Sequence, residues 1–333
     1  MKKLYAKSVK RLAIDMTLSE NPLGCSPDVL AILRNIDVED VFKYPDMETF
    51  IAKVSSIFGV SSNNLMVGTG SEQLIKLIVQ IFVNQDDTVA IPRSSFDVFS
   101  KEAGLKTNNV EFVKIKNLLG AKNRFKLIFL CNPNNPTGEK LDNQFIGAVI
   151  QNNPKSLIVI DEATGEFLGN DESFVKKSLG LENVIVLKTV SKVFGGAGLR
   201  VGFAFGNRLL IRKLNDSQQA FPISCISAKL ALACLKDTEF VRRTKEFIAR
   251  ERNFIRNELE GMGFEVSNSI TNNLLITDKG NPGLVKMLAD KEVSVVDAKF
   301  FPGSRVAGFR VAIRDKVTNR KFLSIVMRLK GGD

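Results

Sequence analysis

Six apolar segments rich in β-branched residues recur along the chain, separated by helical or loop-like stretches. They are Thr88 to Ile91, Val110 to Ile115, Leu127 to Cys131, Leu157 to Ile160, Val184 to Leu187 and Val201 to Phe205. Short continuous apolar runs are typical of strands that are buried on both faces. Their alternation with helical stretches predicts an α/β fold whose sheet is mainly parallel.

The chain before the first of these segments is irregular up to about Val38. Two prolines and a glycine between Ser19 and Pro27 exclude a long regular element, so we expect an extended arm that ends in a short helix. An apolar-periodic run from Met47 to Phe58 then predicts a helix closed by Gly59. Tyr44 lies in the loop before this helix, where surface packing is the usual role of a tyrosine.

The segment from Val67 to Phe82 begins with glycines and continues as an amphipathic helix. Thr69 and Glu72 have the spacing of a capping box. The backbone amides of Gly70, Ser71 and Glu72 would lie at the positive end of the helix dipole, where they could hold a phosphate. Glycine loops that open helices are common, so this pattern alone is a weak signal.

Composition narrows the class of protein. A chain of 333 residues predicts two domains, and its excess of 11 positive charges suits an anionic small molecule, an acidic surface or a nucleic acid. The basic residues do not cluster enough to indicate nucleic acid, and the densest group has the spacing of a solvated helix face: Arg242, Arg243, Lys245, Arg250 and Arg252. There is no histidine, so acid–base chemistry falls to Lys, Asp, Glu or Tyr, and we expect no metal site.

Four cysteines show no C-x-x-C pairing, and we expect them to be free, buried thiols in a reducing compartment: Cys25, Cys131, Cys225 and Cys234. The basic N-terminus lacks the apolar run of a signal peptide, and no stretch is long and apolar enough for a membrane span. These features predict a cytoplasmic enzyme.

Polar residues follow three of the predicted strands. Asn135 comes after Leu127 to Cys131, Asp161 after Leu157 to Ile160, and Ser191 with Lys192 after Val184 to Leu187. Ligands of parallel sheets bind beyond the carboxyl ends of the strands, so we expect these side chains to meet at one rim.

Lys192 is the candidate reactive group at that rim. A lysine amine forms a Schiff base with a carbonyl when its surroundings favour the unprotonated form. If the carbonyl belongs to pyridoxal phosphate (PLP), a phosphate must lie nearby, and Ser191 and Arg200 could bind it. Serine-lysine pairs and glycine loops are common, however, so this segment is not decisive alone.

Asp161 follows an apolar run and should be poorly solvated, so it needs a partner. A protonated pyridine nitrogen is such a partner, because the carboxylate keeps the ring cationic and able to accept electrons. The alternative is a helix cap or a metal ligand in a nucleotide enzyme.

Ordered motifs carry a family resemblance. They are E-N-P-L-G from Glu20, Y-P-D at Tyr44, G-T-G-S-E at Gly68, N-P-N-N-P-T-G from Asn132 to Gly138, D-E-A from Asp161, S-K at Ser191, G-L-R-V-G from Gly198 to Gly202, and F-R-V-A-I at Phe309. In this order the chain resembles the fold-type I PLP-dependent aminotransferases, and within them the histidinol-phosphate aminotransferase branch. The resemblance covers about Leu18 to Leu323.

The resemblance implies a role for each matching residue. Lys192 would bind PLP covalently and move the proton between the substrate Cα and the cofactor, while Asp161 would pair with the pyridine nitrogen. The other cofactor contacts would come from Gly70, Ser71, Glu72, Phe96, Asn135, Thr164, Ser191 and Arg200. For Phe96, a role as a core aromatic between Phe82 and Phe99 remains open.

The resemblance also implies partners. Arg310 would bind the substrate α-carboxylate with Asn135 beside it, and Asn21 would close over the substrate. Tyr44 would reach the phosphate of a neighbouring subunit, which implies a homodimer with shared sites. We expect no nucleic-acid or membrane partner.

This chain departs from the family pattern at two positions. Thr164 stands where the family usually has a tyrosine that donates to the cofactor ring oxygen, so Asn135 would act alone or with a water. Val296 stands where the family tends to have an arginine that helps to bind the substrate phosphate, although Lys299 and Arg305 follow closely in the sequence.

The expected organisation is a large PLP-binding domain over residues 39–225 and a small α+β domain over residues 226–333, with an arm, residues 1–38, that packs on the small domain. The predicted function is amino-group transfer between an L-amino acid, or an amino phosphate such as histidinol phosphate, and a 2-oxo acid. Decarboxylation of a phosphorylated amino acid remains an alternative, because the PLP ring assists several bond cleavages. A catalytically weak PLP-binding or regulatory protein is the other, although no helix-turn-helix pattern supports it.

Overall fold

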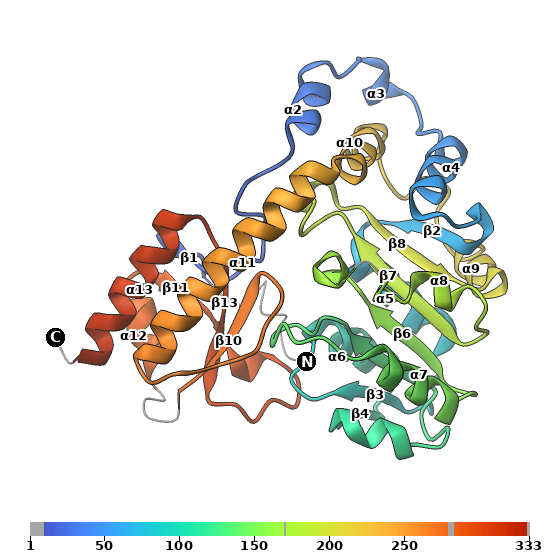
Figure 1. The fold of residues 1–333 in the computed structure, drawn as a ribbon. Helices are drawn as coiled ribbons and strands as arrows, with labels where there is room; N and C mark the ends of the chain where they lie inside the picture. Colours follow the sequence, from blue (N-terminus) through green and yellow to red (C-terminus); the bar gives the residue numbers. More distant parts are fainter. Residues whose placement is uncertain (1–9, 170, 279–282, 332–333) are drawn as a thin grey trace.

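The computed structural model describes residues 10–169, 171–278 and 283–331. The first nine residues of the expected arm lie outside this part of the chain. Figure 1 shows a larger body built on a long sheet and a smaller body that carries the C-terminus, with helix α11 (Thr238–Gly261) extending from one to the other.

The larger body contains a sheet of seven strands in the order β2-β8-β7-β6-β5-β3-β4. Strands β7, β6, β5, β3 and β4 are parallel, and β8 runs antiparallel to its neighbours β2 and β7. The strands are β2 (Leu65–Gly68), β3 (Val89–Pro92), β4 (Val110–Val113), β5 (Leu127–Cys131), β6 (Leu157–Asp161), β7 (Val184–Thr189) and β8 (Gly202–Gly206).

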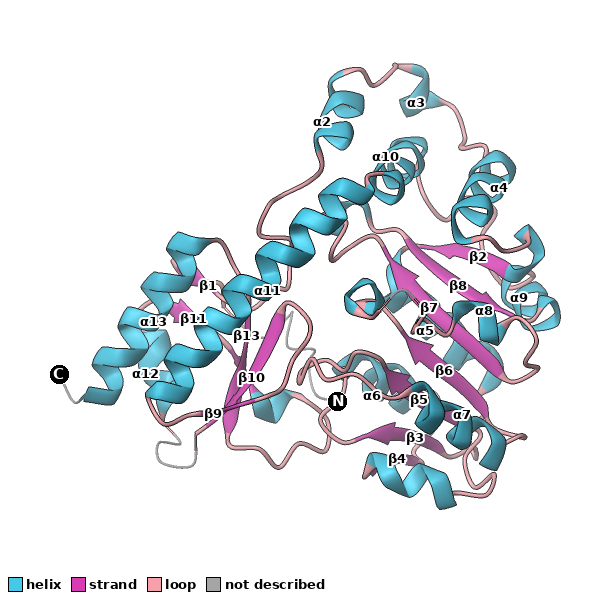
Figure 2. Cartoon of the chain, viewed as in Figure 1, coloured by secondary structure: helices cyan, strands magenta, loops and turns pink. Residues whose placement is uncertain are grey.

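Helices cover both faces of this sheet (Figure 2). Successive strand residues point to opposite faces, so Leu157 and Val159 of β6 enter one apolar cluster while Ile158 and Ile160 enter the other. The first cluster includes helices α5 (Gly70–Phe82), α6 (Asp97–Gly104) and α9 (Arg208–Asn215). The second includes α2 (Pro27–Arg34), α4 (Met47–Phe58), α7 (Asn143–Asn152), α8 (Val175–Ser178) and α10 (Cys225–Lys236).

The smaller body is an antiparallel sheet in the order β12-β13-β10-β9, packed with helices. Its elements are β9 (Glu265–Val266), β10 (Asn273–Thr277), α12 (Leu284–Asp290), β11 (Val293–Ser294), β12 (Val296–Asp297), β13 (Gly308–Ala312) and α13 (Lys316–Gly331). The predicted α/β fold, with a large and mainly parallel sheet and a smaller α+β unit, is confirmed.

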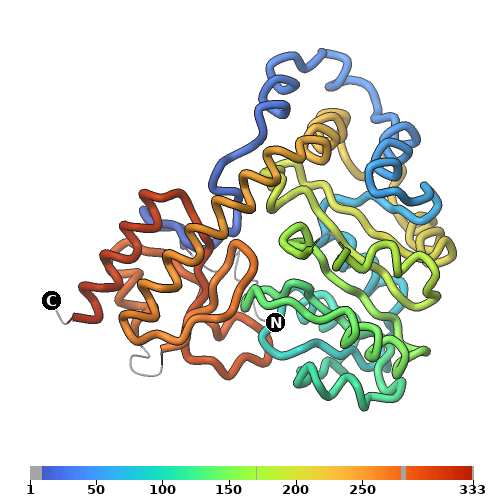
Figure 3. Tube along the Cα trace, in the orientation of Figure 1, coloured from blue at the N-terminus to red at the C-terminus, as the bar shows by residue number. Residues whose placement is uncertain are grey.

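The N-terminal segment joins the two bodies, as the blue end of the tube in Figure 3 shows. Strand β1 (Ile14–Asp15) pairs in parallel with β11 of the smaller body, and Met16 is buried in its core. Farther along, α2 packs against α10, and α3 (Glu39–Phe42) follows. The arm is therefore extended before its first helix, as the prolines predict.

Three details differ from the sequence-based expectations. Strand β2 was not predicted, because its four residues L-M-V-G directly precede a glycine-rich helix start and look like part of that loop. The prediction of a capping box at Thr69 is wrong. The Thr69 hydroxyl makes no hydrogen bond to the helix start and donates to the carbonyl of Pro222 instead (2.7 Å). Arg252 does not belong to a solvated face, because it donates to the backbone carbonyls of Ile270 and Thr271.

The cysteine and membrane expectations can also be compared with the structure. All four cysteines are free, but only Cys131 and Cys234 are buried, while Cys25 and Cys225 are partly exposed. In the described ranges, no helix combines the length and apolar character needed to cross a bilayer.

Candidate active site

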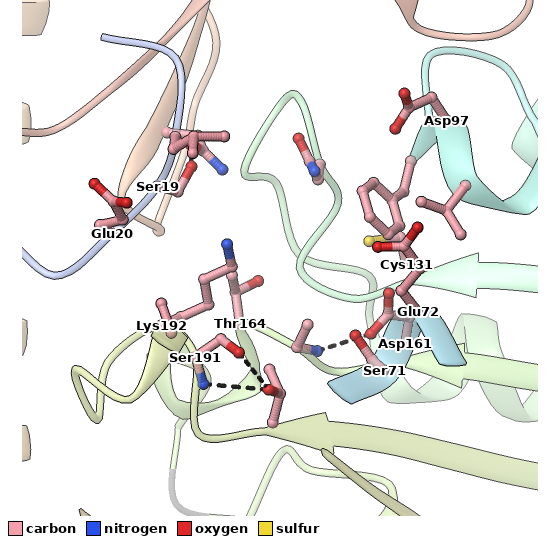
Figure 4. A pocket seen from close by; sticks show the side chains of 18 of the residues that line it. Ser19, Glu20, Ser71, Glu72, Asp97, Cys131, Asp161, Thr164, Ser191 and Lys192 are labelled. Carbon is pink, nitrogen blue, oxygen red and sulfur yellow. Dashed lines mark hydrogen bonds between the residues drawn. The ribbon is translucent and has the colours of Figure 1, made fainter. Parts of the chain in front are cut away.

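A cavity of about 370 Å³ lies where the carboxyl ends of β5, β6 and β7 meet the first turn of α5. Nine of the residues predicted for the site line it: Ser71, Glu72, Phe96, Asn135, Asp161, Thr164, Ser191, Lys192 and Arg200. Figure 4 shows Ser19 and Glu20 of the arm across the cavity from Asp161 and Ser71. Strand ends, a helix start and the arm thus enclose one space.

Asp161 is the last residue of β6 and lies beside Cys131 and Leu187 of the neighbouring strands. Its side chain is 2% exposed, and one carboxylate oxygen accepts a hydrogen bond from the amide of Ala163 (3.0 Å). Burial raises the pKa of Asp161 to about 6, although the Ala163 amide and the nearby charge of Lys192 both lower it. A carboxyl of this kind is suited to receive a cationic group from a ligand.

Ser191 and Lys192 follow β7, and both line the cavity. The Ser191 hydroxyl is within hydrogen-bond distance of the Thr189 hydroxyl (2.8 Å), which in turn donates to the carbonyl of Val201 (2.9 Å). Because Thr189 donates to that carbonyl, the Ser191 hydroxyl donates to Thr189 in this arrangement. Thr189 is thus a cavity residue that was not predicted from the sequence.

The start of α5 forms a tight cradle with Arg200. Gly70 has a φ of +78°, and a Cβ atom there would lie 2.8 Å from an Nη atom of Arg200. A Cβ on Gly202 would lie 2.7 Å from the amide nitrogen of Ser71. Glycine at both positions lets the backbone amides and the guanidinium approach one another, which is the arrangement that binds a phosphate at a helix start.

Asn135 and Arg310 are hydrogen-bonded to each other. Arg310 donates to the side-chain oxygen of Asn135 (3.0 Å) and also to the carbonyl of Thr17. This contact fixes the orientation of the Asn135 amide, so that its NH₂ group remains a donor for another partner. Arg310 is fully buried and lies behind Asn135, outside the set of residues that line the cavity.

Thr164 and Phe96 complete the walls. The Thr164 hydroxyl donates to the carbonyl of Pro133 at 3.4 Å. Phe96 packs edge-on against Phe99 with ring centroids 5.6 Å apart, and it also lines the cavity. Both roles considered for Phe96, core aromatic and cavity wall, are therefore compatible with its position.

Four of the predicted site residues lie outside the cavity lining: Gly70, Arg310, Asn21 and Tyr44. The Asn21 amide donates to the carbonyl of Val193 (2.7 Å) and to the Thr244 hydroxyl (3.1 Å), so it joins the arm to the segment that follows Lys192. Tyr44 is 80% exposed and stacks on Phe221 with ring centroids 4.5 Å apart.

Several lining residues were not predicted, among them Leu18, Ser19, Glu20 and Asn273. They come from the arm and from β10 of the smaller body, and no local pattern indicates that these segments meet. Asn132 to Gly138 helps to bring them together, because the Gly138 carbonyl accepts from the amide of Ile270 (2.9 Å).

Comparison with known proteins agrees with this geometry. The model of the family "Aminotransferase class I and II" matches residues 13–326. The chain belongs to the class I and II aminotransferases. It is therefore a PLP-dependent aminotransferase of fold type I.

Named relatives support the same family. A histidinol-phosphate aminotransferase of Thermoanaerobacter pseudethanolicus is 33% identical over 322 residues, covering 91% of this chain and 88% of the relative. The crystal structure of a histidinol-phosphate aminotransferase from Sinorhizobium meliloti in complex with pyridoxal-5'-phosphate has a TM-score of 0.89 at 21% identity, covering 97% of this chain and 92% of that one.

The decarboxylation alternative is not favoured by these comparisons. The structure of L-threonine-O-3-phosphate decarboxylase from Porphyromonas gingivalis has a TM-score of 0.83 at 20% identity, covering 95% of this chain and 99% of that one. A likeness at this identity shows a common fold, whereas the family model and the relative at 33% identity are aminotransferases.

Proposed function

We propose that the cavity around Lys192 and Asp161 is the active site, where the aminotransferase exchanges an amino group between an L-amino acid and a 2-oxo acid. The buried carboxyl of Asp161, which faces the cavity near Lys192 and whose pKa is raised by burial, is the observation that carries this assignment. When bound, the cofactor ring supplies an electron sink for the pair released at the substrate Cα.

The residues present fit the cofactor. Asp161 would pair with the pyridine nitrogen, and a cation at that position favours the ionised carboxylate. The NH₂ group of Asn135, oriented by Arg310, would donate to the ring oxygen. Phe96 would pack against the ring, with Thr164 at its edge.

The phosphate would lie in the cradle at the start of α5. The amides of Gly70, Ser71 and Glu72 lie in the first turn, and Arg200 supplies the positive charge. The Ser71 hydroxyl would add a donor, and the Ser191 hydroxyl would add another by turning from Thr189 to the phosphate. Together they would hold a dianion through charge-assisted hydrogen bonds, which are stronger than those between neutral groups.

Lys192 would attach the cofactor and then act as the proton carrier. Its amine would accept the proton from the substrate Cα and donate it to the cofactor.

Arg310 would bind the substrate α-carboxylate, with Asn135 and the arm around it. Histidinol phosphate, the substrate in the names of the relatives, is one candidate amino donor. Asn21 donates a hydrogen bond to the carbonyl of Val193, the residue after Lys192, and would keep the arm closed over the site.

We further propose a cytoplasmic homodimer with a domain division at residues 39–225 and 226–333. An apolar patch on the arm side supports the dimer, because Val38, Val41, Phe42 and Tyr44 are each at least 67% exposed. Burial of this patch would let Tyr44 reach the partner's phosphate cradle. Phe42→Asp should then shift the mass in sedimentation experiments to that of a monomer, and an unchanged dimer would reject this interface.

The function is tested by reducing the cofactor-loaded protein with borohydride and mapping the labelled peptide. We expect the label on Lys192, and Lys192→Ala should lose both label and amino-acid conversion. Lys76→Ala, which changes an exposed lysine on α5, is the matched control and should keep both. A label on another lysine would overturn the assignment.

A further inference from the structure

We infer that this aminotransferase selects an amino acid with an uncharged, apolar side chain and discriminates against phosphate monoesters. The inference rests on the proposed function and specifies its substrate class. It is drawn from the residues around Arg310, which belongs to β13 of the smaller body and lies behind the cavity residue Asn135.

Val296 is the immediate cross-strand neighbour of Arg310. Strands β12 and β13 are antiparallel, and their register places Val296 directly opposite Arg310. Side chains of such a pair lie on the same face of the sheet, with Cβ atoms about 5 Å apart. Val296 is fully buried, so the position beside the guanidinium is occupied by hydrocarbon.

The apolar surroundings of Arg310 continue into the cavity wall. Val296 and Phe301 form a small buried cluster, and Leu18, Phe96 and Phe300 pack against it. The Arg310 guanidinium carbon lies 5.8 Å from the centroid of the Phe301 ring. Leu18 and Phe96 belong to this cluster and also line the cavity, so a bound side chain would contact an apolar wall.

Two cations, Lys299 and Arg305, follow Val296 in the sequence, but their side chains do not contribute charge to the cavity. Lys299 forms an ion pair with Asp297 at 2.7 Å and its side chain is 74% exposed. Arg305 is exposed as well, and neither residue lines the cavity.

The arm brings an ion pair, and its cation is already engaged. Glu20 lines the cavity and pairs with Arg314 at 3.1 Å. Among the lining residues in the described ranges, Lys192 and Arg200 are the cations, and the proposed function assigns both to the cofactor.

The charges therefore match a monoanion. One guanidinium can neutralise an α-carboxylate through a two-pronged contact. A phosphate dianion at Arg310 would keep excess charge beside the apolar Val296 and Phe301, and burying uncompensated charge is costly. An apolar side chain, in contrast, gains from contact with the same wall.

The test measures binding of unreactive ligands to the cofactor-loaded protein, in which the phosphate cradle is occupied. Isothermal titration with 3-phenylpropionate and with phenyl phosphate compares a carboxylate and a phosphate on the same ring. We expect the carboxylate to bind at least about tenfold more tightly, which corresponds to ~1.4 kcal/mol. Equal binding, or tighter binding of phenyl phosphate, would overturn the inference.

Variants locate the cause. Val296→Arg should reduce the preference by about tenfold through tighter phosphate binding, whereas Val296→Leu keeps an apolar neighbour and should preserve it. Because Val296 is buried, Leu18→Lys serves as a second variant that adds a cation at the cavity wall without filling that site. An unchanged ratio in folded protein of both cationic variants would contradict the inference. The borohydride experiment tests the proposed function separately: if the label on the wild-type protein is found on a lysine other than Lys192, the proposed function is rejected, whatever the ratio of the two ligand affinities.

Discussion

Two adjacent buried carboxyl groups at the end of β6 have opposite surroundings. Asp161 is 2% exposed and Glu162 is 0% exposed, and they point to opposite faces of the sheet. Glu162 accepts hydrogen bonds from the Ser173 hydroxyl (2.6 Å) and the Phe174 amide (2.7 Å), and it pairs with Lys188. Asp161 accepts from the Ala163 amide and faces the cavity.

The pKa values reflect this difference. Burial disfavours the charge of Lys188, but Glu166 and Glu162 outweigh it, and the pKa of Lys188 is raised. At Asp161 burial dominates and raises the pKa to about 6. The charges on the face with Glu162 are paired within the protein, whereas on the cavity face burial outweighs the nearby charge of Lys192 and the Asp161 carboxyl faces an open space. A buried carboxyl with a raised pKa in a cavity is typical of a binding site.

The largest expected effect comes from Lys188→Met. This substitution removes the cation of the structural cluster, which consists of Lys188, Glu162 and Glu166. Lys188 lies 2.8 Å from Glu166 and 3.4 Å from Glu162, and all three side chains are at most 12% exposed. Two carboxylates would then face each other without compensation, and loss of one partner from a buried pair costs about 3–5 kcal/mol. Urea unfolding at pH 8 should show this loss of stability.

A second substitution separates charge from packing in that cluster. Lys188→Met combined with Glu162→Gln and Glu166→Gln should recover much of the lost stability, because no buried charge remains. If the triple variant is as unstable as the single one, the loss comes from packing of the lysine chain.

The next effect has the opposite sign. In cofactor-free protein, Asp161→Asn should raise the free energy of unfolding at pH 8 by up to about 3 kcal/mol, from the difference between a pKa of about 6 and its usual value of 3.8. A carboxyl whose pKa is raised by folding contributes most at low pH, and this contribution is lost as pH rises through 6. The gain of the variant should therefore vanish below about pH 4.

The same substitution should have an unfavourable effect on cofactor binding. In the loaded protein Asp161→Asn lacks the carboxylate that the proposed function pairs with the ring nitrogen, so cofactor affinity should fall while the cofactor-free protein gains stability. Lower affinity without the gain would indicate a distorted site, and a gain with unchanged affinity would show that Asp161 does not contact the cofactor.

The cavity face was the more predictable of the two from sequence. Asp161, Ser191 and Lys192 were recognised because chemical groups follow apolar strand segments, and parallel strands bring their carboxyl ends to one rim. The glycines at Gly70 and Gly202 were part of local motifs as well. Local patterns suffice where strand order alone positions the residues.

The ion cluster of Lys188, Glu162 and Glu166 was not predicted, and neither was the entry of Ser19 and Glu20 of the arm into the cavity. Lys188 lies within the apolar run of β7, and its pairing with Glu162 depends on the register between β6 and β7. Ser19 and Glu20 reach the cavity through long-range contacts, such as the donation from the Ser19 hydroxyl to Asn273. Such contacts have no signature in a single sequence, since they depend on how distant segments pack.

A smaller effect sharpens the roles within the cluster. Glu166→Gln should cost roughly 1 kcal/mol, because Lys188 keeps Glu162, whereas Glu162→Gln should cost about 2 kcal/mol because Glu162 also accepts from Ser173 and Phe174. Thermal or urea unfolding of the two variants measures the order. The reverse order would mean that the shorter contact of Glu166 with Lys188 outweighs the additional hydrogen bonds of Glu162.

The smallest effect is expected at Thr164, on the cavity face. Its hydroxyl donates to the Pro133 carbonyl at 3.4 Å, near the outer limit of a hydrogen bond, so the donor is directed toward the loop. Thr164→Val should therefore cost roughly 0.5 kcal/mol of stability and change cofactor affinity by no more than about twofold. Thr164→Ser keeps the hydroxyl and is the matched control. If the hydroxyl instead bonds to the charged ring oxygen of the cofactor, Thr164→Val would lose roughly 1.5 kcal/mol of binding, more than tenfold in affinity, while Thr164→Ser would not. Fluorescence titration of cofactor binding to the two variants distinguishes these outcomes, and the larger loss would show that threonine replaces the missing tyrosine as a donor beside Asn135.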